Sequence, residues 1–289
     1  MVEIKVLACE LPSQADLPLA RFSLTELHRE VLRRGIVASI GRTTIWRWLS
    51  EDAIRPWRHR SWLFPRDPAF TEKAGRVLDL YEGLWEGRPL GPQDFVISTD
   101  EKTSIQCRRR IHATQPPAPT ESMRVEHEYE RRGAWAYLAA WDVRRAKVFG
   151  RCERSTGIAP FRRLVAQVMR REPYRSAARV FWIMDNGSSH RGQRCAERLQ
   201  RQWPNLVVVH TPIHASWLNQ IEIYFSVIQR KVLTPNDFRS LKEVRDRLLR
   251  FQAHYEKAAQ PFQWKFTRSD LEALMKRVQA REAQERAVA

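Results

Sequence analysis

A strand-like apolar run that stops at an acid is the feature that most constrains this chain. Residues 180–184, VFWIM, are apolar throughout, as in a strand buried on both faces. Asp185 and Asn186 follow directly. An earlier run, residues 94–99, ends in the same way at Asp100. We therefore expect two buried strands that each end in a carboxylate, and the question is what these carboxylates hold.

Strand and helix patterns alternate from residue 94 onward. Their order is three strands, then helix, strand, helix, strand and helix. This order predicts a mixed α/β sheet with helices on its faces. The last helix carries Glu222 among apolar neighbours. If the first and fourth strands are parallel neighbours, Asp100 and Asp185 leave the same end of the sheet, and that helix brings Glu222 to them.

Three carboxylates crowded together repel one another, and a divalent cation relieves the repulsion. Hard oxygen ligands suit Mg²⁺ or Mn²⁺. Two such ions, roughly 4 Å apart, would stabilise both the attacking and the leaving oxygen at a phosphodiester. Each acid alone is a weak signal, because an aspartate at a strand end often only caps the next helix. The combination of Asp100, Asp185 and Glu222 in a basic chain is a stronger one.

The N-terminal part has the pattern of two helices joined by a turn. Residues 23–35 begin with a serine N-cap and end in glycine, and residues 40–52 follow after a short turn. Such a pattern is typical of a helix-turn-helix that reads DNA. Its second helix would present four side chains to the major groove, namely Arg42, Thr43, Thr44 and Arg47. An ordinary helical hairpin with solvated arginines fits this window equally well.

A basic, proline-containing segment follows the two helices. Residues 54–68 contain Arg55, Arg58 and Arg60, with tryptophans between them. Three prolines disfavour a long helix, so the segment fits an extended linker along a phosphate backbone or a connector held by its tryptophans. The predicted organisation has four regions: a helix-turn-helix region at 1–53, a linker and helix at 54–93, a catalytic domain at 94–239 and a helical extension at 240–289.

The charge is strongly positive and unevenly distributed. The 289 residues include 50 lysines and arginines against 33 acids, a net charge of +17. Residues 1–99 hold 14 basic and 13 acidic side chains, whereas residues 100–289 hold 36 and 20. This excess favours a polyanionic partner for the larger C-terminal part. Arg108, Arg109 and Arg110 fit phosphate contacts beside the predicted site, or a solvated turn.

Several classes of protein are disfavoured. No apolar run approaches the ~20 residues of a membrane-spanning helix, and the N-terminus lacks the pattern of a signal peptide. The four cysteines are scattered without a CxxC pair, which disfavours a disulfide framework or a zinc knuckle. The sequence predicts a soluble cytoplasmic protein with no membrane partner.

Three segments closely resemble the catalytic blocks of DDE transposases. They are STDEKT at 98–103, MDNGSSH at 184–190 and HTPIHASWLNQIEIYFS at 210–226. The resemblance is to the bacterial insertion-sequence branch of the mariner superfamily, and it covers roughly residues 20–270. The third block is the most specific. Thirty-six residues separate Asp185 from Glu222, near the range typical of the superfamily.

The resemblance implies an RNase H-like catalytic core preceded by helix-turn-helix units. It implies that Asp100, Asp185 and Glu222 are the metal-binding triad, with two Mg²⁺ or Mn²⁺ ions. The implied activity is cleavage at terminal inverted repeats followed by strand transfer into target DNA, by a homodimer or a larger synaptic complex. Members of this branch usually carry two helix-turn-helix units. Because fewer than 25 residues precede Ser23, we expect the first unit to be missing or truncated here.

Other polar residues near the triad have two possible roles. Asn186 and Asn219 fit outer partners of the carboxylates or of metal-bound water, or simple loop caps. His190 fits a contact with DNA or water, or a hydrogen bond that holds its own loop. Two alternative functions also remain open: a catalytically inactive DNA-binding remnant, and an RNase H-like nuclease that acts on RNA–DNA hybrids.

Overall fold

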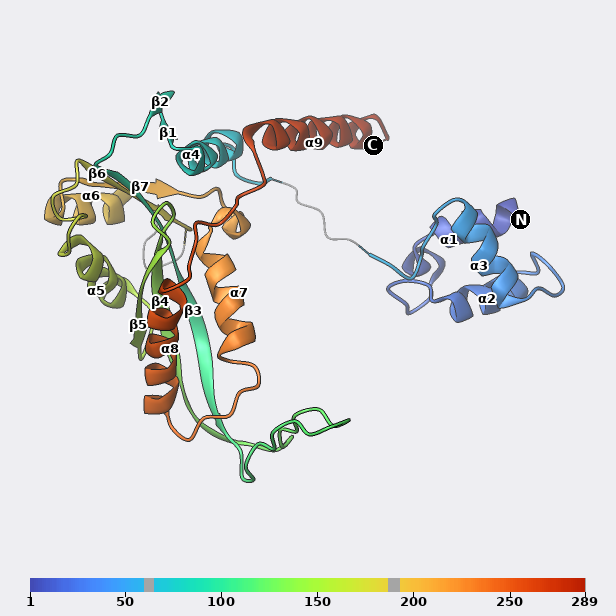
Figure 1. Cartoon of the computed structure of the whole chain (residues 1–289). Coiled ribbons are helices and arrows are strands. Elements are labelled where there is room, and N and C mark those ends of the chain that lie inside the picture. Colours follow the sequence, from blue (N-terminus) through green and yellow to red (C-terminus); the bar gives the residue numbers. More distant parts are fainter. Residues whose placement is uncertain (60–64, 187–192, 289) are drawn as a thin grey trace. The chain divides into compact units, whose positions relative to one another are not determined.

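The computed structural model describes residues 1–59, 65–186 and 193–288, and the chain divides into two compact units (Figure 1). The N-terminal unit is Met1–Phe64 and the C-terminal unit is Pro65–Ala289. Each unit has its own hydrophobic core and is described by itself.

The N-terminal unit is built from α1 (Val2–Cys9), α2 (Leu24–Arg33) and α3 (Arg42–Glu51), with a short 3₁₀ helix at Pro12–Ala15. All three α-helices contribute to one core. Its fully buried side chains include Ile4, Leu7, Leu27, Val31, Ile45 and Leu49. Ile4, Leu7 and Ala8 of α1 recur at helical spacing, which is why this segment forms a helix although we did not predict one there.

The helix α2 begins where the sequence predicts it. The hydroxyl of Ser23 accepts a hydrogen bond from the Glu26 N–H at 3.2 Å, and the Ser23 N–H donates to the Glu26 carboxylate at 2.8 Å. This reciprocal capping satisfies two backbone donors at the helix start. Residues 34–41 connect α2 to α3, which is longer than the turn of about three or four residues in a helix-turn-helix. The assignment of a DNA-reading motif therefore stays a prediction.

The C-terminal unit contains a five-stranded mixed sheet of order β5–β4–β3–β6–β7. The strands are β3 (Asp94–Arg109), β4 (Glu130–Asp142), β5 (Lys147–Glu153), β6 (Arg179–Met184) and β7 (Leu206–His210). Neighbours β3, β4 and β5 are antiparallel, whereas β6 runs parallel to both β3 and β7. The predicted mixed sheet is confirmed. The first and fourth strands are parallel neighbours, which is the condition under which Asp100 and Asp185 leave the same end of the sheet.

The expectation that the first strand ends at Asp100 is wrong. Its parallel pairing with β6 stops at Ser98, but β3 continues to Arg109 because β4 pairs with it along this whole length. Asp100 consequently lies within a strand, opposite Ala139. Residues 110–129 then form an excursion with two isolated antiparallel bridges, and most of its side chains are exposed.

Helices cover the two faces of the sheet (Figure 1). On one face Ile97, Leu138 and Trp182 share a core with α5 (Ile158–Met169) and α6 (Gln193–Gln202). On the other face α7 (Ile221–Lys231) packs on β3 and β4, and α8 (Leu241–Glu256) packs on β4 and β5. The alternation of side chains along β3 therefore decides which residues face α7.

The segments at both ends of the C-terminal unit are joined to each other. The helix α4 (Phe70–Glu82) precedes a short hairpin of β1 (Leu84–Trp85) and β2 (Arg88–Pro89), and it contacts α9 (Arg268–Val288). Arg268 donates two hydrogen bonds to the Asp79 carboxylate, at 2.7 and 2.5 Å. In the described part of the chain, no helix combines the length and the apolar character needed to span a membrane.

One carboxylate makes the N-terminal unit sensitive to pH. Glu30 is buried in α2, and hydrogen bonds from Arg33, supplemented by Arg34, lower its pKa to about 2. An unfolded glutamate titrates near pH ~4.3. Since the folded pKa is the lower one, Glu30 stabilises the unit above about pH 4.5, and this contribution is lost as the pH falls toward about 2. Glu30→Gln should reduce amide protection in α2 at neutral pH.

The difference in α2 protection between the wild type and Glu30→Gln should shrink as the pH falls through this window. Comparison at each pH removes the intrinsic pH dependence of hydrogen exchange. Glu51→Gln is a suitable control, because Glu51 is exposed and forms no ion pair with a described residue. A difference that stays constant down to acid pH would contradict this role of Glu30.

Candidate active site

The parallel register of β3 and β6 brings Asp100 and Asp185 to the same level of the sheet. Ser98 is the Cα partner of Ile183, an offset of 85 residues that also holds for Asp94 and Arg179. The same offset, continued for two residues, sets Asp100 beside Asp185. Side chains two residues apart in a strand leave the same face, so both aspartates belong to the face of Ser98, which is the face covered by α7.

A buried hydrogen-bond cluster fixes the start of α7 on that face. The Ser98 hydroxyl donates to Asn219 Oδ1 and accepts from the Ile221 N–H at 2.8 Å. The Asn219 side-chain amide donates to the Thr99 carbonyl at 2.8 Å. The hydroxyl of Tyr81, in α4, donates a hydrogen bond to the Leu218 carbonyl at 2.7 Å. These contacts place the first turn of α7, and therefore Glu222, next to β3.

Glu222 interacts with both aspartates. It is exposed to solvent on one side, yet partial burial of its carboxyl raises its pKa, and the negative charge of Asp185 raises it further. The positive charge of Lys102 and a hydrogen bond with Asp100 act in the opposite direction. The three carboxyl groups, distant along the chain, are therefore neighbours in space, and Lys102 is the nearby cation.

The donor chemistry of this cluster fits a hard divalent cation, because all its ligand atoms would be carboxylate oxygens. Burial of the Glu222 carboxyl, with the negative charge of Asp185, raises its pKa and so opposes its ionisation. Among the described residues, no three His, Cys, Asp or Glu side chains already have the arrangement of a metal site.

A cavity of about 470 Å³ lies directly beside Asp185. It is lined by Asp185, Asn186 and the segment 211–216 that follows β7. The Asn186 side-chain amide donates to the Thr211 carbonyl at 2.7 Å, which ties Asn186 to the residue that follows β7. Asp185, which is half-buried, thus borders open space.

Comparison with known protein families identifies residues 96–245 as a DDE superfamily endonuclease domain. This span is more than half of the chain and contains all three carboxylates. The chain belongs to the DDE superfamily endonuclease family. Curated protein sequences gave no match.

Solved structures of Mos1 transposase have a similar fold. The chain is 13% identical to the Mos1 transposase paired-end complex with left transposon end, with a TM-score of 0.50, covering 96% of this chain and 76% of that one. The Mos1 strand transfer complex gives the same identity and TM-score and covers 96% and 75%. At this identity the likeness concerns the fold: a mixed α/β core with a five-stranded sheet and flanking helices.

Asn186, His190 and Asn219 were predicted to surround the three carboxylates of this DDE domain, and each is considered in turn. Asn219 is fully buried, and its side chain is hydrogen-bonded to Ser98 and Thr99 of β3, so it positions α7. Asn186, the residue after Asp185, donates to the Thr211 carbonyl. His190 lies outside the described residues, and its role stays a prediction.

Arg108 and Arg109 lie in β3 itself, because this strand continues past Asp100. Phosphate contacts by Arg108, Arg109 and Arg110 stay a prediction. Arg110 donates to the backbone carbonyls of Asn236 and His127, at 3.2 and 2.8 Å. These arginines hold the base of the 110–129 excursion together.

The predicted DNA-reading residues lie in the N-terminal unit. Arg42, Thr43 and Arg47 are exposed on α3, and Thr44 is half-buried. Arg55 and Arg58 are exposed beyond α3, where Ile54 and Trp57 pack on the core of this unit. Arg60 lies outside the described residues.

Sequence reasoning missed Lys102, Ser98 and Tyr81. The signal for the first two was available: they lie two residues after and two residues before Asp100, so the period of a strand puts all three side chains on one face. Tyr81 carries no such signal, because its contact with residues 218 and 220 spans more than 130 positions of the sequence.

The hydrogen bonds of Asn219 generate a stability prediction. Asn219→Ala would leave the buried Thr99 carbonyl and Ser98 hydroxyl without this partner, and such a loss costs about 1–3 kcal/mol. We expect chemical denaturation to give a free energy of unfolding lower by about that amount. In a cycle with Ser98→Ala, the two changes should be non-additive by about 0.5 kcal/mol or more. Strict additivity would show that the two side chains act independently.

Proposed function

We propose that this protein is a DNA transposase of the insertion-sequence branch of the mariner superfamily. It would cut phosphodiester bonds at the terminal inverted repeats of its element and transfer the strand to target DNA. The observation that carries the proposal is the interaction of Glu222 with Asp100 and Asp185 beside an open cavity. Membership of the DDE superfamily endonuclease family and the similarity to the Mos1 transposase fold support it.

Asp100, Asp185 and Glu222 are the proposed ligands of two Mg²⁺ or Mn²⁺ ions. Bound there, such ions supply charge stabilisation for the attacking and leaving oxygens of a phosphodiester. The chain itself supplies the preorganisation. The register of β3 and β6 sets the two aspartates level, and Ser98 with Asn219 fixes the helix that carries Glu222. Lys102 lends positive charge where the phosphate backbone would approach.

The proposed partner is double-stranded DNA, both as transposon end and as target. The net charge of +17 and its concentration in residues 100–289 support a polyanionic partner. The proposed readers of the repeat are Arg42, Thr43, Thr44 and Arg47 of α3. The Mos1 structures are described as a paired-end complex and a strand transfer complex, and we propose a homodimer or a larger synaptic assembly for this chain as well.

Metal-dependent cleavage tests the proposed catalytic role. The full chain, incubated with supercoiled DNA that carries the element ends, should nick it in Mg²⁺ or Mn²⁺ and should not do so in EDTA. Asp185→Asn should reduce nicking by more than the roughly 10–100-fold cost of removing an outer partner of a metal ligand. Agarose gels resolve the nicked and supercoiled forms.

Glu101→Gln is the matched control for this variant. It removes a neighbouring carboxylate whose side chain leaves β3 on the opposite face from Asp100. Nicking that persists undiminished in Asp185→Asn would reject the catalytic assignment. DNA binding without cleavage under any divalent ion would favour the non-catalytic alternative, and preference for an RNA–DNA hybrid would favour the nuclease.

DNA reading by α3 makes a separate prediction. Arg47→Ala should weaken binding to a duplex from the element end by about 1–3 kcal/mol if the guanidinium contacts a base, and binding to unrelated duplexes should change less. Gel-shift titrations at fixed salt measure both. Arg29→Ala removes an exposed arginine of α2 as a control. Equal losses in the two variants would argue against a reading role for α3.

A further inference from the structure

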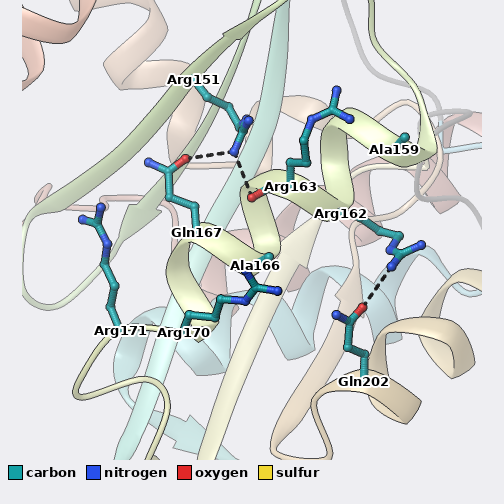
Figure 2. A pocket seen from close by; sticks show the side chains of 9 residues that line it. All are labelled: Arg151, Ala159, Arg162, Arg163, Ala166, Gln167, Arg170, Arg171 and Gln202. Carbon is teal, nitrogen blue, oxygen red and sulfur yellow. Dashed lines mark hydrogen bonds between the residues drawn. The ribbon is translucent and has the colours of Figure 1, made fainter.

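An arginine-rich groove lies along the outer side of α5 (Figure 2). Its volume is about 600 Å³. Five arginines line it, namely Arg151, Arg162, Arg163, Arg170 and Arg171. The remaining lining consists of two glutamines and two alanines. Nothing in the proposed catalytic chemistry uses this groove.

The groove follows one face of a helix. Arg162, Arg163, Ala166, Gln167 and Arg170 recur at the spacing of neighbours on a helix surface. From Arg162 to Arg170 the helix rises by about 12 Å. Phosphates of one DNA strand advance about 3.4 Å each along the duplex axis, so the groove is long enough for about three of them.

The positive charge of the groove is largely uncompensated. Glu153 is the carboxylate that pairs with it: Arg163 donates to its two oxygens at 3.0 and 2.7 Å, and Arg151 donates at 2.7 Å. Arg162, Arg170 and Arg171 form no ion pair with a described residue. Arg162 lies 3.5 Å from Gln202 (Figure 2), and Arg171 lies over the Phe149 ring at 5.6 Å.

The lining identifies an extended polyanion rather than a compact ligand. Small-molecule sites are mostly apolar, with a few converging polar groups. This groove instead presents guanidinium groups, amides and the methyl groups of Ala159 and Ala166, which let a ligand approach the helix closely. Arginine is the residue suited to repeated phosphate contacts. A sugar–phosphate backbone matches both the length and the charge.

The sheet separates the groove from the carboxylates. The buried side of α5, including Phe161 and Leu164, shares a core with Ile97 of β3. Ser98, the next residue, faces α7 and the site of Asp100. The groove and the carboxylates therefore lie on opposite faces of the sheet.

We infer that the α5 groove binds the backbone of a second DNA segment, distinct from the one held at Asp100, Asp185 and Glu222. The identity of the polyanion as duplex DNA rests on the proposed function. Binding needs no divalent cation, since the contacts come from guanidinium groups alone. The affinity should therefore depend on salt and on the number of groove arginines, whatever the DNA sequence.

The test measures binding of the full chain to a fluorescent duplex of unrelated sequence, in EDTA, between about 50 and 200 mM salt. The groove variant is Arg162→Gln, Arg170→Gln and Arg171→Gln together. Each lost phosphate contact lowers the slope of log K against log salt by about 0.9, so we expect a slope smaller by about 2 to 3 and binding at least about tenfold weaker at low salt.

The matched control is Arg250→Gln, Lys257→Gln and Lys276→Gln together, which removes the same charge from exposed positions outside the groove. This variant should bind nearly as the wild type. A triple Arg→Lys variant of the groove keeps the charge and should retain the wild-type slope, which separates charge from folding. Equal losses in the groove and control variants, or a Lys variant as weak as the Gln variant, would overturn the inference.

The binding test of the α5 groove can succeed or fail independently of DNA cleavage. If the wild type cleaves no DNA but the groove variant selectively loses duplex binding, the second site stands and the proposed function fails. If the wild type nicks DNA in Mg²⁺ while groove and control variants bind alike, the proposed function stands and the second site fails.

Discussion

The parallel pairing of β3 with β6 is the constraint on which the rest of this protein depends. It is held at one end by Arg179, which donates two hydrogen bonds to Asp94 at 3.0 and 2.7 Å across the two strands. From that fixed point the register runs through five partner pairs to Ser98 and Ile183. The positions of Asp100 and Asp185, and through Ser98 the position of Glu222, follow from it.

The carboxylates themselves add little to the stability of this arrangement. Burial and the charge of Asp185 disfavour an ionised Glu222, and Lys102 and the hydrogen bond with Asp100 only partly offset this. The scaffold therefore stabilises a locally unfavourable charge cluster with uncharged contacts nearby, among them the Ser98–Asn219 hydrogen bonds and the packing of Tyr224 and Phe225 on Trp141 and Tyr137. Groups with a shifted pKa that a surrounding scaffold holds in place are common at functional sites.

The core could be predicted from the sequence where local pattern and burial agree. The alternation of elements after residue 94 and the N-cap at Ser23 were both readable, because apolar periodicity and capping chemistry are local signals. The outer half of β3 could not be predicted from the sequence. Residues Glu101–Ser104 are polar and partly exposed, and they form a strand only because β3 pairs with β4. Arg108 was therefore expected after the strand, whereas it lies within β3.

The alternation of side chains between the two faces of β3 limits where the length of this domain can change. Ser98 secures α7 and Asp100 supplies an acid, and both do so from one face of the same strand. An insertion or deletion of a single residue between Arg179's partner Asp94 and Ser98 would turn both side chains to the opposite, apolar face at once. Insertions and deletions should therefore be tolerated in the 110–129 excursion. Within residues 94–100 they should disrupt the site, whatever residue is inserted.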